Sequence, residues 1–119
     1  MSFAPQGGGG KGGIATELLA TGSITADGTD QYILSRTAGE IEAIFGWIDI
    51  NAMQDGDGIT ITTKIDDRIH AQEIYEDAAA NGILYLVKRT INASSTYKII
   101  LKQTKGTNRT YPYKLFIER

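Results

Sequence analysis

The stretch that decides the fold is Ala43–Ile65, AIFGWIDINAMQDGDGITITTKI, which reads as two strands joined by a turn. From Ile59 to Ile65, isoleucines and a threonine alternate with threonines and a lysine, which is the period of two expected of a half-buried strand. The first strand, within Glu40–Ile50, is largely apolar on both faces and carries the single tryptophan, Trp47. This pattern predicts a central strand that is covered on both sides.

The turn between these strands, Asn51–Gly58, is built from residues that tolerate a positive φ. Its segment Asp55-Gly56-Asp57-Gly58 also resembles a fragment of a calcium loop. It lacks the third oxygen ligand and the distal bidentate glutamate of an EF-hand. The sequence therefore favours a turn over a metal site.

Composition supports strands and excludes several functional classes. The chain has 119 residues, with 17 isoleucines, 13 threonines and six tyrosines, all residues that favour strands. Its net charge of −2 gives no general attraction for nucleic acid or acidic lipid, and it has no cysteine. No apolar run approaches the roughly 20 residues that cross a bilayer, and no signal peptide is recognisable. We expect a protein made in the cytoplasm, with neither a membrane nor a nucleic acid as partner.

Six further strands are predicted outside the central stretch. Ile14–Thr25 is ambiguous, because Ala15–Ala20 could begin a helix, although Gly22 and the threonines favour a strand. Short turn spacing and the absence of a βαβ rhythm predict an all-β fold, an antiparallel β-sandwich of about eight strands, jelly-roll-like, with a β-barrel as the alternative. Pro112 lacks a donor N–H, so we expect the last strand at an edge or with a bulge there. The six strands are Ile14–Thr25, Gln31–Arg36, Arg68–Tyr75, Ile83–Ile91, Thr96–Thr104 and Arg109–Glu118.

A Gly-rich N-terminal arm, residues 1–13 (MSFAPQGGGGKGG), precedes a single β-sandwich domain, residues 14–119. Ordering about 13 residues costs on the order of 1–2 kcal/mol each, so a fixed arm needs a contact surface. Either the arm docks on a neighbouring molecule, with its glycines in a narrow crevice, or it is a simple tail. The predicted partner-binding residues are Phe3, Pro5, Gly7, Gly8, Gly9, Gly10 and Lys11.

No arrangement of residues indicates an active site. His70 is the only histidine and is interpreted as a structural or surface residue. Asp49, Asp66 and Asp67 could supply the paired carboxylates of a glycosidase, but neighbours in a strand point to opposite faces, so a solvated turn is favoured for Asp66 and Asp67. We expect no catalytic residue, no metal, no cofactor and no small-molecule substrate.

Charged and aromatic residues leave two alternatives open. Acids dominate Asp49–Asp77 and bases the C-terminal third, which indicates either an ordinary solvated face or head-to-tail contact between copies. Aromatic side chains either pack in the core or form a sugar-stacking platform, so a carbohydrate-binding β-sandwich module is the alternative function. The bases are Lys88, Arg89, Lys98, Lys102, Lys105, Arg109 and Lys114, and the aromatics are Trp47, Tyr85, Tyr97, Tyr111 and Tyr113.

Three segments resemble small β-sandwich proteins encoded among the virion structural genes of tailed and archaeal viruses. They are LATGSITADGTDQ (19–31), GWIDINAMQDGD (46–57) and YKIILKQT (97–104), and the resemblance extends over most of residues 17–118. It implies a non-enzymatic capsid decoration or coat subunit, located in the virion after synthesis in the host cytoplasm. It also implies homo-oligomer or major-capsid-protein contacts through the arm and the sheet edges. It supplies no functional residues.

Overall fold

The computed structural model describes residues 16–78 and 82–119 and contains eight strands. Each predicted strand is confirmed to within a few residues, and the ambiguous first segment is a strand. The predicted arm, with Phe3, Pro5, Gly7–Gly10 and Lys11, lies outside the described residues. The strands are β1 (Thr16–Thr25), β2 (Gln31–Thr37), β3 (Glu42–Asp49), β4 (Gly58–Ile65), β5 (Arg68–Glu76), β6 (Ile83–Ile91), β7 (Thr96–Lys105) and β8 (Thr110–Glu118).

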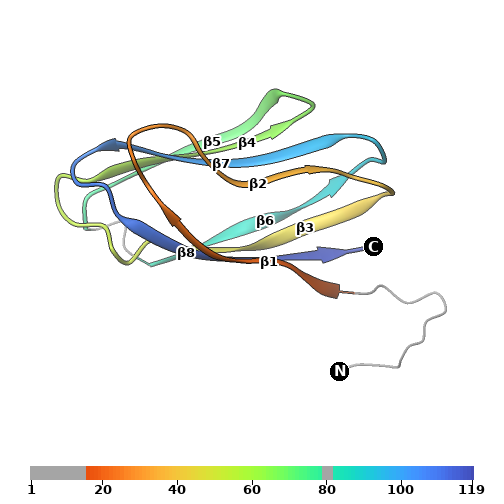
Figure 1. Ribbon diagram of the computed structural model, residues 1–119, viewed down its shortest axis with the longest axis horizontal. Helices are drawn as coiled ribbons and strands as arrows, with labels where there is room; N and C mark the ends of the chain where they lie inside the picture. Colours follow the sequence, from red (N-terminus) through yellow and green to blue (C-terminus); the bar gives the residue numbers. More distant parts are fainter. Residues whose placement is uncertain (1–15, 79–81) are drawn as a thin grey trace.

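The strands form two antiparallel four-stranded sheets that face each other (Figure 1). The β1 sheet has the order β1-β8-β3-β6, and the β2 sheet has the order β2-β7-β4-β5. β1 pairs with β8, β2 with β7, β3 with β6, and β4 with β5. The chain is therefore a long two-stranded ribbon that doubles back at the β4–β5 turn. Pairing of β3 with β8 and of β4 with β7 then closes the two sheets. This wrapped ribbon is the jelly-roll arrangement of a β-sandwich.

The two strands of the opening stretch do not pair with each other, because β3 and β4 belong to opposite sheets. β3 is central, as predicted, and turns Ile44 and Ile48 into the core. Phe45 and Trp47, on its other face, are only partly buried. Among the described residues no second layer covers that face, so the prediction of cover on both sides is wrong. Neighbouring side chains account for the partial burial: Phe116 of β8 stacks on Phe45 with ring centroids 5.5 Å apart.

Isoleucine, leucine and tyrosine side chains from the two inner faces fill the core. Burying one such apolar side chain contributes roughly 1.5–3 kcal/mol. The core also holds a satisfied polar pair, in which the Tyr111 hydroxyl donates to Gln103 Oε1 at 2.7 Å. The fully buried apolar residues include Ile48, Ile50, Met53, Ile59, Ile99, Leu101, Tyr111 and Leu115.

Pro112 does not mark an edge strand, because β8 lies between β1 and β3. The prediction fails because proline requires only that no neighbouring strand needs its absent N–H, and this condition is met at Pro112 within a central strand. The ladder between β3 and β8 ends at Tyr113, so Pro112 has only Ser23 of β1 beside it. The bulge in the β1–β8 pair lies at Leu18/Ala20 and not at the proline.

Gly46 lets β3 and β8 approach closely. A Cβ atom built there would lie 2.1 Å from the carbonyl oxygen of Lys114 and 2.9 Å from Cα of Leu115. Any side chain at this position therefore collides with backbone in the middle of the sheet.

Candidate functional site

The turn that resembles a calcium fragment is held by protein groups. The buried Asp57 carboxylate accepts hydrogen bonds from Arg109 Nε at 2.8 Å, Gln54 N at 2.8 Å and Thr107 N at 3.0 Å. The guanidinium of Arg109, followed by the backbone donors, holds the pKa of Asp57 below its ordinary value. Asp55 accepts from Ala78 N at 3.1 Å. The two carboxylates thus connect loops, which supports the predicted turn.

Asp57 joins three loops at one end of the sandwich. Its side chain binds the β7–β8 loop, and its carbonyl oxygen accepts from Asp77 N of the β5–β6 loop at 2.9 Å. Gly106, at φ +79°, lies so close that a Cβ atom there would be 2.2 Å from Asp57 Oδ1. The β3–β4 loop is therefore fixed to both neighbouring loops.

A second buried carboxylate lies at the start of β3. Glu42 accepts from Arg36 Nε at 2.6 Å and from Arg36 Nη2 at 2.9 Å, a bidentate pair. The Arg36 hydrogen bonds hold the pKa of Glu42 below its ordinary value, and Arg119, 3.9 Å away, adds to this. Neither residue was predicted to be functional, because nothing in the sequence around Glu42 indicates its partner.

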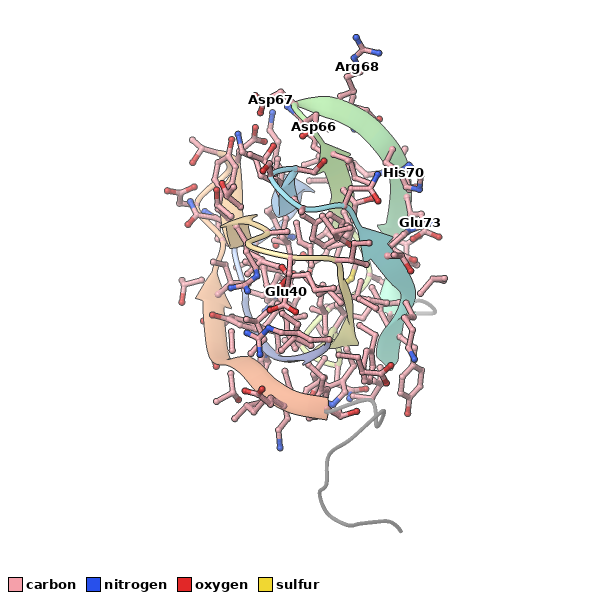
Figure 2. The ribbon with its side chains drawn as sticks, turned by 90° about the vertical axis from the view of Figure 1, so that its right-hand side faces the viewer. Glu40, Asp66, Asp67, Arg68, His70 and Glu73 are labelled. Carbon is pink, nitrogen blue, oxygen red and sulfur yellow. The ribbon has the colours of Figure 1, made fainter. Side chains whose placement is uncertain are left out.

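The three carboxylates considered for hydrolysis do not converge. Asp49 ends β3, near the start of β4, and accepts from Asn51 N at 2.9 Å. Asp66 and Asp67 lie beyond the other end of β4, at the tip of the β4–β5 turn (Figure 2). The Asp66 carboxylate accepts from Thr96 N at 3.0 Å, which anchors this turn to β7. A strand of this length separates its ends by roughly 25 Å. Within residues 16–78 and 82–119, no three His, Asp or Glu side chains are grouped as a metal site would require.

The acidic and basic regions of the sequence pair with each other inside the molecule. Three of the singled-out bases contact acids of the Asp49–Asp77 region: Arg109 with Asp57, Lys98 with Asp67 at 2.6 Å, and Lys105 with Glu76. A fourth, Lys88, contacts Glu118 at 2.8 Å. These pairs neutralise much of the charge separation that head-to-tail contact would use. The solvated-face interpretation therefore describes the charges better.

The aromatic residues are divided between core and surface, so they form no single platform. Tyr97 and Tyr111 are buried, and Tyr113 packs against the core. Trp47 and Tyr85 are cross-strand neighbours on the outer face of the β1 sheet, where Tyr85 is 77% exposed. Of the five aromatic residues considered for a platform, Tyr85 is the one that is largely exposed.

The exposed large apolar residues gather on the edge strands β1, β2, β5 and β6. An open groove of about 190 Å³ lies between the β5 and β6 edges, with Ile61 and Leu86 among its lining residues and Glu73 and Arg89 as charged groups. This groove was not predicted, although the unbroken apolar run at the start of β6 indicated an apolar surface there. On the described strands, the exposed large apolar residues are Leu18, Tyr32, Ile69, Ile74, Ile83, Tyr85 and Val87.

No helix among the described residues is long and apolar enough to cross a membrane. No protein-family model and no curated protein matches the chain. The crystal structure of the infectious bursal disease virus VP2 subviral particle is similar, with a TM-score of 0.50 and 12% identity over 88% of this chain and 32% of that one. The structure of the Gx strain of the same virus has a TM-score of 0.49, 14% identity and the same coverage. The chain thus spans about a third of those proteins, and the likeness establishes a shared β fold.

Proposed function

We propose that this protein is a non-enzymatic structural subunit of a virus particle, a capsid decoration or coat subunit. It contacts copies of itself or a major capsid protein through residues 1–13 and through its sheet edges. The observation that carries the proposal is the placement of exposed apolar side chains on edge strands of a jelly roll. The fold likeness to the viral capsid protein VP2 supports it, whereas the resemblance to tailed and archaeal viruses has no support from that comparison.

Edge strands explain how such a subunit associates. Among the described strands, β5 pairs only with β4 and β6 only with β3, so each presents one row of backbone groups that no described strand pairs with. Ile83, Tyr85 and Val87 add apolar surface beside that row. Another chain that adds to the edge gains backbone hydrogen bonds and apolar contact together.

The groove between β5 and β6 suits the N-terminal arm of a neighbouring copy. The residues before Thr16 can reach up to about 50 Å when fully extended. They leave from β1, the edge strand farthest from β6 in the β1 sheet. A glycine-rich segment approaches an edge backbone without side-chain collisions, and Phe3 supplies an apolar anchor for the groove.

Light scattering coupled to size-exclusion chromatography tests the proposal. We expect the full chain to self-associate with rising concentration, and the variants Δ1–13 and Y85E/V87E to remain monomeric. Ile41→Glu is the matched control, because Ile41 is 63% exposed, close to the 68% of Val87, but lies outside the strands. A full chain that stays monomeric at millimolar concentration, or an I41E variant as impaired as Y85E/V87E, would contradict the proposal.

A further inference from the structure

The outer face of the β2 sheet contains a hollow of about 350 Å³ that the proposed assembly does not use. Ile100 and Thr62 form its floor, and they are only 3% and 8% exposed although both point away from the core. The surrounding side chains therefore rise above them. A volume of this size is in the range of small-ligand sites, roughly 300–1,000 Å³.

Strand register arranges the hollow as rows across the sheet. One row runs through Tyr32, Ile100, Thr62 and Gln72, from β2 to β5. Tyr32 lies at the end of this row, next to Ile100 and outside the residues that line the hollow, and it is 50% exposed. Gln72 Nε2 donates to Thr62 Oγ1 at 3.0 Å, which leaves the Gln72 carbonyl oxygen and the Thr62 hydroxyl proton for a ligand.

The rows on either side carry positive charge. Lys102 lies opposite Thr60 in one, and Lys64 lies opposite Lys98 in the other. Lys98 is paired with Asp67 at 2.6 Å, whereas Lys64 and Lys102 form no ion pair within residues 16–78 and 82–119. The lining contains two lysines and one acid, Asp30, while Asp67, which lies outside the lining, also attracts Lys64. The hollow therefore favours an anionic ligand that also brings hydroxyl groups.

We propose that this hollow binds an acidic oligosaccharide. Lys64 and Lys102 contact its carboxylate or sulfate groups, and Thr60, Gln72 and Asp30 exchange hydrogen bonds with its hydroxyls. The apolar C–H face of one sugar ring packs on Tyr32 and Ile100. A nucleic acid strand fits less well, because it requires a basic track along several phosphates and the chain has a net charge of −2.

Amide NMR titration of the full chain tests this assignment, with a heparin-derived tetrasaccharide as the acidic probe and cellotetraose as the neutral one. We expect shifts confined to the outer face of the β2 sheet with the acidic probe, on β4, β5, β7 and the adjoining β2 residues. The double variant K64Q/K102Q should bind at least about ten-fold more weakly, because two charge-assisted contacts are lost. Tyr32→Ala should also weaken binding, whereas Tyr32→Phe should retain it.

Lys114→Gln is the matched control, since Lys114 lies on the outer face of the opposite sheet, over the Phe116 ring. Equal weakening by K114Q, equal binding of cellotetraose, or tighter binding of an eight-nucleotide single-stranded DNA would overturn the proposal. Absence of binding at millimolar probe would also overturn it. The result is separable from assembly, because Y85E/V87E should lose self-association and keep tetrasaccharide binding.

Discussion

At the scale of single residues, a few buried groups determine whether the layers and loops fit together. Asp57 could be placed in a turn from sequence, but its role as the anchor of three loops could not. Its partners Thr107 and Arg109 are about 50 residues away in the chain, and no local pattern indicates such contacts. Glu42 and Arg36 were missed for a related reason, since an acid in an apolar strand carries no sign of its partner.

We predict that Asp57→Ala lowers the free energy of unfolding by about 3 kcal/mol, because it leaves a half-buried guanidinium and two backbone donors unpaired. Denaturant unfolding followed by circular dichroism measures this. Asp30→Ala, an exposed acid, should change stability by less than about 0.5 kcal/mol. Equal effects of the two substitutions would contradict the anchoring role.

We predict that Gly46→Ala destabilises the protein by about 3 kcal/mol or prevents folding, because the new methyl group collides with the Lys114 carbonyl. Gly39→Ala is the control, since a Cβ atom at Gly39 meets nothing within 4 Å. The melting temperatures of both variants provide the comparison. A G46A protein as stable as G39A would show that β3 and β8 lie farther apart.

At the scale of elements, the positions of the strands could be predicted from the sequence, but the pairing between strands could not. Period-two alternation located strands such as β4, β5, β7 and β8, because it reflects one buried face, whereas β3 and β6 were located as apolar runs between turns. Pairing depends on the wrapped ribbon, which is why β3 and β4 were read as neighbours and Pro112 as an edge marker. The edge groove was missed for the same reason, because edge strands cannot be identified before the sheet order is known.

We predict a coupling free energy of about 1 kcal/mol between Phe45 and Phe116, whose stacked rings join β3 to β8. A double-mutant cycle with F45A and F116A, measured by denaturant unfolding, gives the value. The control cycle pairs Phe116 with Tyr85, which lie on strands separated by β3, and should give coupling near zero. Coupling of the same size in both cycles would argue against a specific ring contact.

At the scale of the whole molecule, Glu42 and Asp57 make stability depend on pH in the acid range. Both have folded-state pKa values below their ordinary values of 4.5 and 3.8, so the folded state favours their ionised forms. Their contribution is complete above those ordinary values and is lost as pH falls toward the lowered folded-state values. We predict that the melting temperature decreases steadily below about pH 4.5. The double variant E42Q/D57N should be less stable at pH 7, and its melting temperature should decrease less steeply as pH falls. A pH profile parallel to that of the unmodified protein would assign the effect to other groups.

The pairing of β1 with β8 places Thr16 directly opposite Glu118, so the two ends of the described fold meet at one rung of the ladder. A load applied between the termini would strain that rung first and then each following one in turn. Opening one rung at a time requires far less force than shearing a whole strand at once. A subunit that is tethered by both ends would thus unfold one residue pair at a time. A subunit that is held across its two sheet faces would resist as a unit.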